Sequence, residues 1–152
     1  LPLKQEHAMA NTQDLEIIER QTGADPKATV IILHGLGADG NDFVPFTSEL
    51  DLSSVGPVRF VFPHAPTRPV TINGGYVMRA WYDIIGVDLV KREDEAGLRE
   101  SQAQIAALID REVARGMPAN RIVLGGFSRS MRNCWSGSCG VMPSAPSTAA
   151  SR

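Results

Sequence analysis

The stretch RIVLGGFSRS, residues 121–130, decides how the rest of the chain is interpreted. A short apolar run of the kind found in buried strands ends in Gly126-Phe127-Ser128, the first half of the pattern G-x-S-x-G. In that pattern a sharp strand-to-helix turn lifts the Ser hydroxyl above the sheet, and the next residue's N–H faces a developing oxyanion. Ser130 stands here where the second Gly is usual, and G-x-S alone is frequent by chance. A second motif is therefore needed.

The stretch VIILHGLGADGNDF, residues 30–43, offers that motif in two interpretations. From Gly35 to Gly40 it fits the dinucleotide fingerprint G-x-G-x-x-G, which also needs an acid about 20 residues further on to bind a ribose. Residues 52–82 contain no Asp or Glu, and Asp39 would place a carboxylate beside the diphosphate. The sequence therefore disfavours nucleotide binding.

The other interpretation is a loop that supplies a backbone N–H to a reacting oxygen. Gly35 and Gly37 provide clearance after a strand, which leaves the amide of Leu36 free to donate. Taken alone, the loop could equally be a glycine-rich connector without chemistry. Followed by Ser128 in the order that acyl transfer requires, it becomes a candidate oxyanion loop.

The remaining pattern alternates strands and helices. Apolar runs predict strands over 15–20, 28–34, 58–63 and 121–128. Pro45 predicts a helix starting near that residue, and a long loop follows His64. A second helix is predicted over 93–115, with one apolar face made by Leu98, Ile105, Leu108 and Ile109. This order indicates an α/β fold with a mostly parallel sheet and flanking helices.

Three stretches together resemble the carboxylesterase and acyl-protein thioesterase family of small α/β-hydrolases: LHGLGADGNDF, FPHAPTRPVTINGGYVMRAWYD and RIVLGGFS. The resemblance covers residues 14–128 and implies an α/β-hydrolase fold, truncated after the nucleophile elbow. It implies an esterase or thioesterase for short to medium acyl groups that works without metal or cofactor. It places the nucleophile at Ser128 and the oxyanion donors at the backbone amides of Leu36 and Arg129. That family usually has Gln-Gly-Gly after the Ser, whereas this chain has Arg-Ser-Met.

Other polar residues near these motifs have simpler interpretations. We expect His34 to support the loop at Gly35 and Gly37 through a hydrogen bond rather than to act as a base. A structural or pocket-lining role is expected for His64, and loop packing for the aromatic residues Trp81 and Tyr82. Asp83 precedes the nucleophile in the chain, so it is a poor candidate for the acid of a triad.

Composition divides the chain into three parts. Residues 1–13 are expected to be a disordered extension, 14–128 the first part of a hydrolase domain, and 129–152 an aberrant tail of low apolar content. The tail contains no Asp, Glu or His to complete a Ser–acid–His triad, so the chain as written is expected to be inactive. We interpret the tail as an out-of-frame or truncated reading. The alternatives are a disordered tail and a genuine remnant that serves as a non-catalytic acyl-binding or interaction fragment.

The overall composition excludes several classes of partner. A net charge of −2 gives no reason to expect nucleic acid, and no apolar stretch reaches the ~20 residues of a membrane span. Cysteine is absent before Cys134, which favours a cytoplasmic protein without disulfides, and the spacing to Cys139 is poor evidence for zinc. The expected partner is a small acyl ester or thioester. The oligomeric state is left open.

Overall fold

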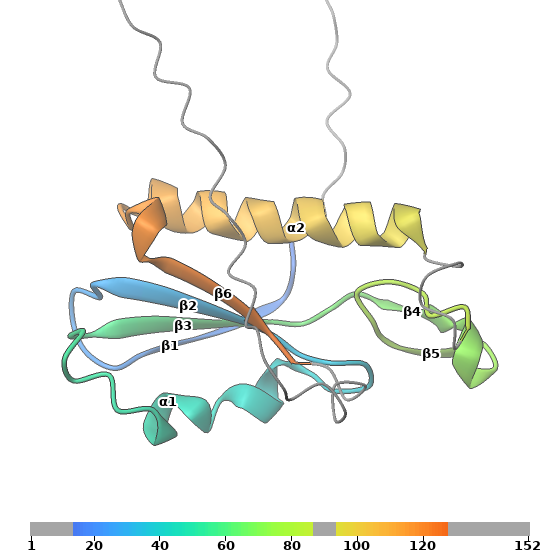
Figure 1. Cartoon of the computed structure of the whole chain (residues 1–152), viewed down its shortest axis with the longest axis horizontal. Coiled ribbons are helices and arrows are strands. Elements are labelled where there is room, and N and C mark those ends of the chain that lie inside the picture. The colour runs from blue at the N-terminus through green and yellow to red at the C-terminus, as the bar shows by residue number, and fades with distance from the viewer. Residues whose placement is uncertain (1–13, 87–93, 128–152) are drawn as a thin grey trace, which may run out of the picture.

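The computed structural model describes residues 14–86 and 94–127, which form a four-stranded sheet, a small hairpin and flanking helices (Figure 1). The proposed nucleophile Ser128 and donor Arg129 lie outside the described residues, as do the segments 1–13 and 129–152. Strand order in the main sheet is β1-β3-β2-β6. The strands are β1 (Ile17–Gln21), β2 (Ala28–Leu33), β3 (Val58–Pro63) and β6 (Ile122–Gly126).

The sheet is mostly parallel, as predicted. β2 lies between β3 and β6 and runs parallel to both of them. β1 departs from this pattern because it pairs antiparallel with β3, with Ile17 opposite Pro63. The end of β1 is held there by Thr22, whose amide donates to the Val58 carbonyl at 3.0 Å. Its hydroxyl also accepts a hydrogen bond from the Val58 amide at 2.9 Å.

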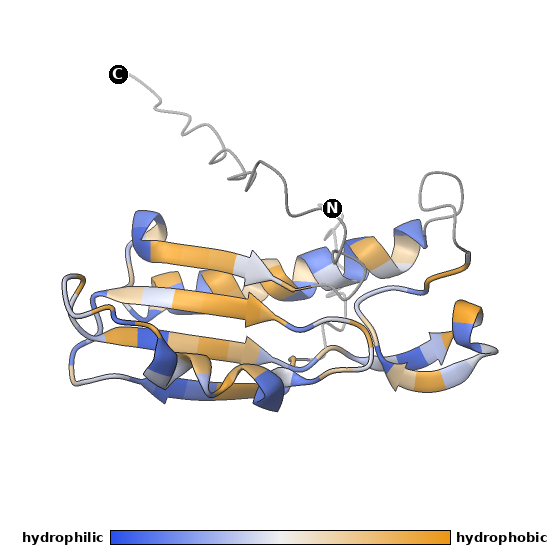
Figure 2. Ribbon diagram, turned by 60° about the horizontal axis from the view of Figure 1, so that its bottom comes forward, coloured by the Kyte–Doolittle hydropathy of each residue, from blue (hydrophilic) through white to orange (hydrophobic). Residues whose placement is uncertain are grey.

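Each face of the sheet buries its own hydrophobic cluster because side chains alternate along a strand. Ile31 faces the long helix α2 (Glu95–Ala114) and packs with Val61 and Leu108. Ile32 faces the opposite side, where the 3-10 turn η1 (Gly40–Phe43) and the short helix α1 (Phe46–Glu49) lie. Figure 2 shows the resulting hydrophobic strands between more polar helix surfaces. The sheet thus has a helical layer on each side.

The helix predicted near Pro45 is only one turn long, and the predicted loop after His64 contains secondary structure of its own. Within that loop β4 (Thr67–Val70) pairs antiparallel with β5 (Tyr76–Arg79), through the 3-10 turn η2 (Thr71–Asn73). Asp83 secures this hairpin by accepting hydrogen bonds from the Thr71 amide at 2.7 Å and the Thr71 hydroxyl at 2.5 Å. A final 3-10 turn, η3 (Ala119–Arg121), leads into β6.

A buried carboxylate joins α2 to the sheet. Glu112 is fully buried, and its Oε2 lies 2.7 Å from Arg59 Nη1 on β3 and 3.0 Å from the Thr29 hydroxyl on β2. Arg115 donates to Glu112 Oε1 at 3.0 Å and to Glu19 on β1 at 2.8 Å. Burial alone would raise the pKa of Glu112, but hydrogen bonds from Arg59 and Thr29 lower it. Hydrogen bonding to Arg115 lowers the pKa of Glu19 to about 2. Both groups are therefore ionised at neutral pH.

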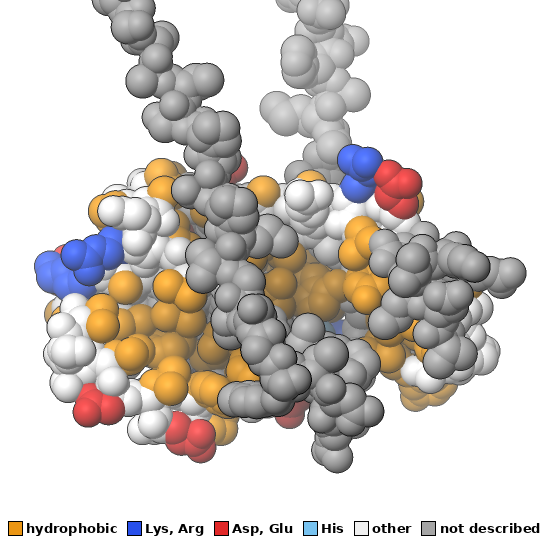
Figure 3. Space-filling view, in the orientation of Figure 1, with side chains coloured by type: hydrophobic (Ala, Val, Ile, Leu, Met, Phe, Trp, Pro, Cys, Tyr) orange, Lys and Arg blue, Asp and Glu red, His pale blue; other side chains and the backbone are white. Residues whose placement is uncertain are grey.

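β6 forms one edge of the sheet. In residues 14–86 and 94–127, no strand pairs with its outer side. Val123, Leu124 and Phe127 are exposed by 57%, 46% and 49%, although their sequence is typical of an interior strand. Hydrophobic side chains gather on the face of the molecule where β6 lies (Figures 1 and 3). Such an uncharged apolar edge favours intermolecular strand pairing.

We expect a charged side chain on this edge to reduce self-association, because Lys on an edge strand opposes pairing with another chain. Leu124→Lys should shift the protein toward monomer in sedimentation velocity. Ile72→Lys is the matched control, since Ile72 has a similar exposure of 43% but lies on the hairpin turn. Equal behaviour of the two variants would contradict a role for the β6 edge.

Candidate active site

Two chain segments meet at the carboxyl ends of β2 and β6. Leu33, the last residue of β2, is opposite Gly126, and its carbonyl accepts a hydrogen bond from the Phe127 amide at 3.0 Å. Residues 35–40, called the glycine loop below, begin directly after His34 at this edge. The residue after Phe127 is Ser128, so the described structure ends where the proposed nucleophile begins.

Three aromatic rings connect the end of β6 to the segment that follows the glycine loop. Phe127 stacks on Phe43 with ring centroids 4.9 Å apart and meets Phe46 edge-on at 5.6 Å. Phe43 and Phe46 are 5.7 Å apart. These contacts hold the last described residue before Ser128 against η1 and α1.

His34 is buried at the start of the glycine loop. Its Nδ1 lies 2.9 Å from the Gly35 carbonyl, and its Nε2 accepts a hydrogen bond from the Ala65 amide at 2.9 Å. The indole N–H of Trp81 donates to the His34 carbonyl at 2.9 Å, and the two rings lie 5.4 Å apart. Burial lowers the pKa of His34 below its ordinary 6.5, so the imidazole is neutral at pH 7.

His64 lies at the other end of the glycine loop. Its Nδ1 accepts a hydrogen bond from the Gly40 amide at 3.2 Å. Asp39 caps the turn that starts there, since its carboxylate accepts from the Asn41 amide at 2.7 Å. That hydrogen bond lowers the pKa of Asp39. The amides of Gly40 and Asn41 at the start of η1 therefore both have acceptors.

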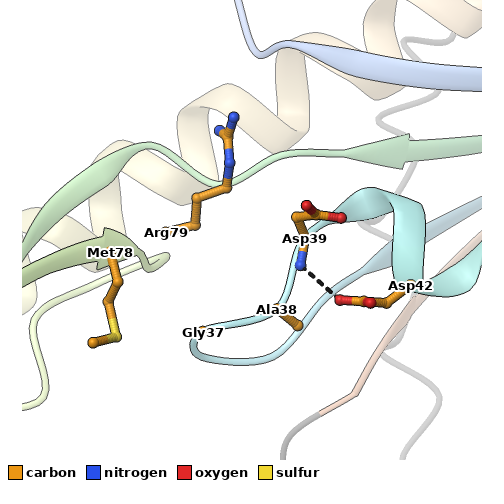
Figure 4. A pocket seen from close by; sticks show the side chains of 6 residues that line it. All are labelled: Gly37, Ala38, Asp39, Asp42, Met78 and Arg79. Atoms are coloured by element: carbon orange, nitrogen blue, oxygen red, sulfur yellow. Dashed lines mark hydrogen bonds between the residues drawn. The ribbon is translucent and has the colours of Figure 1, made fainter.

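The middle of the glycine loop is open. Gly37 has a φ of +72°, which favours glycine, and a Cβ there would meet no atom within 4 Å. In the described part of the chain, no acceptor takes the hydrogen of the Leu36 amide. A pocket of about 400 Å³ lies alongside (Figure 4). Its lining comes from the loop, η1 and β5: Gly37, Ala38, Asp39, Asp42, Met78 and Arg79.

The sequence analysis expected a structural or pocket-lining role for His64, and the hydrogen bond with the Gly40 amide is a structural one. The partner itself was missed, because Gly40 is 24 residues away and nothing in the local pattern around His64 indicates that contact. The Asp83 carboxylate accepts a hydrogen bond within the hairpin, and the Asp83 amide donates to the Asp94 carboxylate at 2.9 Å.

Within residues 14–86 and 94–127 no group of three His, Cys, Asp or Glu side chains could hold a metal ion. No helix in the same ranges is long and apolar enough to span a membrane.

A mostly parallel sheet, with a glycine loop and a strand leading into G-x-S at the same edge, is typical of the α/β-hydrolase class. The sequence profile of the phospholipase/carboxylesterase family matches residues 13–130, and the chain belongs to that family.

Known relatives agree with this assignment. Acyl-protein thioesterase 1 of Schizosaccharomyces pombe is 46% identical over 102 residues, which cover 67% of this chain and 45% of that protein. The solved structure of Zea mays acyl-protein thioesterase 2 has a TM-score of 0.62 and 32% identity, covering 75% of this chain and 46% of that one. Arabidopsis thaliana SOBER1 gives a TM-score of 0.62 at 32% identity, covering 66% and 49%. The chain thus spans about half the length of the relatives it matches.

Proposed function

We propose that this chain carries the nucleophile and the oxyanion donors of a cytoplasmic serine hydrolase for short to medium acyl esters or thioesters. The observation that carries the proposal is the hydrogen bond from the Phe127 amide to the Leu33 carbonyl. It ties the strand that precedes Ser128 in the sequence to the strand that precedes Leu36, which supports the proposal that nucleophile and donor act at one edge of the sheet.

In the proposed reaction, Ser128 Oγ attacks the acyl carbonyl and the backbone amides of Leu36 and Arg129 stabilise the oxyanion of the tetrahedral intermediate. The hydroxyl must lose its proton during the attack, and a neutral His normally accepts it. Residues 129–152 contain no His, Asp or Glu, so the 152-residue chain should react slowly. The same absence favours a second candidate function, a non-catalytic acyl-binding or interaction fragment.

Covalent labelling distinguishes the two functions. We expect a fluorophosphonate probe to modify Ser128 slowly, with the site identified by peptide mass spectrometry. The label should disappear in Ser128→Ala and persist in Ser53→Ala, a matched change at an exposed serine. Absence of label in the wild-type chain, or equal label in the wild type and Ser128→Ala, would support the non-catalytic fragment. Turnover of p-nitrophenyl butyrate provides a second measurement on the same variants.

A further inference from the structure

The two ends of the glycine loop are each held by an imidazole, and the hydrogen-bond partners identify the protonation state of both rings. The Gly35 carbonyl can only accept, so Nδ1 of His34 carries the proton. The Ala65 amide can only donate, so Nε2 of His34 is unprotonated. The Gly40 amide also can only donate, so Nδ1 of His64 is unprotonated. The two rings are therefore neutral in opposite tautomers.

We infer that His34 and His64 act as a paired clamp on the glycine loop, and that the clamp holds only while both imidazoles are neutral. His34 holds the first residue of the loop and joins it to Ala65, whereas His64 holds the last residue, Gly40. Ala65 directly follows His64, so one short segment after β3 secures both ends of the loop. We assign both His34 and His64 a positioning role.

Protonation removes the acceptor that each imidazole offers to a backbone amide. A proton on Nε2 of His34 would face the Ala65 N–H, and a proton on Nδ1 of His64 would face the Gly40 N–H. Both side chains are buried, with exposures of 2% and 6%, so the displaced amides would have no water as a substitute. The Ala65 and Gly40 amides would then be unsatisfied buried donors, and the loop would lose its links to the segment after β3.

Three charged groups of the described residues affect the pKa of His34. His64 and Arg79 of β5 act to lower it, and Asp39 of the loop acts to raise it. The Arg79 guanidinium is already bound to the Ala65 carbonyl and to Glu16, both at 3.0 Å. Burial is the largest influence on His34 and lowers its pKa, so the neutral ring persists somewhat below pH 6.5. Stability contributed by the His34 contact with Ala65 is complete above that pH and is lost on further acidification.

The clamp has a consequence for catalysis that rests on the proposed function. Leu36 lies between the two clamped ends, so loss of either hydrogen bond would release the amide proposed to stabilise the oxyanion. Labelling of Ser128 should then fall at acid pH. The clamp itself is measurable without any reaction, through exchange of the Gly40 amide hydrogen.

The test compares two replacements of His64. In His64→Asn the side-chain carbonyl can stand near the position of Nδ1 and accept from Gly40 without titrating. His64→Leu has a similar size and no acceptor. Hydrogen exchange with residue-level fragmentation gives the protection factor of the Gly40 amide, corrected for intrinsic exchange, over a series of pH values. NMR follows the protonation of the His64 ring in the same series.

We expect wild-type protection of Gly40 to fall about tenfold as the His64 ring becomes protonated, the worth of one hydrogen bond. His64→Asn should stay protected through the same pH series, and His64→Leu should be unprotected throughout. His7→Asn, the same chemical change outside the described residues, should behave as the wild type. Constant protection in the wild type while His64 becomes protonated, retained protection in His64→Leu, or loss in His64→Asn would overturn the inference. Absence of Ser128 labelling at every pH would contradict the proposed function and leave this measurement unaffected.

Discussion

Glu112→Ala is expected to lower the free energy of unfolding by about 3–5 kcal/mol, the cost of removing one member of a buried ion pair. Glu112 is fully buried, and its carboxylate accepts hydrogen bonds from Arg59 at 2.7 Å and from the Thr29 hydroxyl at 3.0 Å. Without it, the buried guanidinium of Arg59 loses its main partner on α2. The midpoint of urea denaturation, followed by circular dichroism, measures the effect.

Glu95→Ala is the matched control on the same helix. Glu95 also pairs with an arginine, Arg99, at 2.7 Å, but its side chain is 75% exposed. An exposed pair of this type contributes only about 0.3–0.5 kcal/mol. The two variants have the same change of residue and the same pair distance, but only Glu112 is buried and has further partners in Thr29 and Arg115. The importance of the buried network would be contradicted if the two variants lost free energy of unfolding to within about 0.5 kcal/mol of each other. That margin is about the contribution of one exposed ion pair.

Gly40→Ala is expected to destabilise the protein by about 2–3 kcal/mol through overpacking. An added Cβ would lie 2.7 Å from the Phe62 carbonyl oxygen and 3.3 Å from the Phe62 Cβ. Every residue of β3 is buried, so its backbone cannot move away without disturbing both hydrophobic clusters. Thermal or urea unfolding would measure the loss.

Gly37→Ala tests the same loop at a position where glycine is favoured by its backbone conformation and not by lack of space. Its Cβ would meet no atom within 4 Å, but its φ of +72° disfavours a side chain. The expected cost is about 1 kcal/mol, smaller than for Gly40→Ala. The reverse order of the two effects would show that the contact with Phe62 is relieved by small shifts.

Much of the fold follows from local sequence pattern. Apolar runs correctly predicted β2, β3 and β6, because a buried strand needs nothing beyond its own hydrophobic residues to be recognised. The second predicted helix, 93–115, matches α2 because acidic residues and Gly116 mark its ends. The resemblance carried by the glycine loop and G-x-S is confirmed by the match to the phospholipase/carboxylesterase family. The roles proposed for Ser128, Leu36 and Arg129 remain predictions for the labelling experiment.

Other features could not be predicted from local pattern. The predicted apolar face of α2 is correct for Leu108, yet the most buried stripe also contains Ser101, Gln104 and Glu112. The hairpin β4–β5 was expected to be a loop, because Pro66, Pro69 and two glycines weaken any strand signal there. β1 was recognised as a strand, but its antiparallel direction depends on contacts with β3.

The sequence by itself determined the class of fold, the order of the main strands along the chain and the position of the motifs. Hydrophobic periodicity and glycine content are local properties. Only the tertiary structure decided which polar side chains are buried. In the sequence Glu112 resembles a surface residue, whereas in the structure its carboxylate accepts hydrogen bonds from Arg59, Thr29 and Arg115. In the sequence nothing distinguishes His64 from other loop histidines, whereas in the structure it accepts a hydrogen bond from the Gly40 amide at 3.2 Å. A polar group can be buried only where distant residues satisfy its hydrogen bonds, and that pairing exists only in the folded chain.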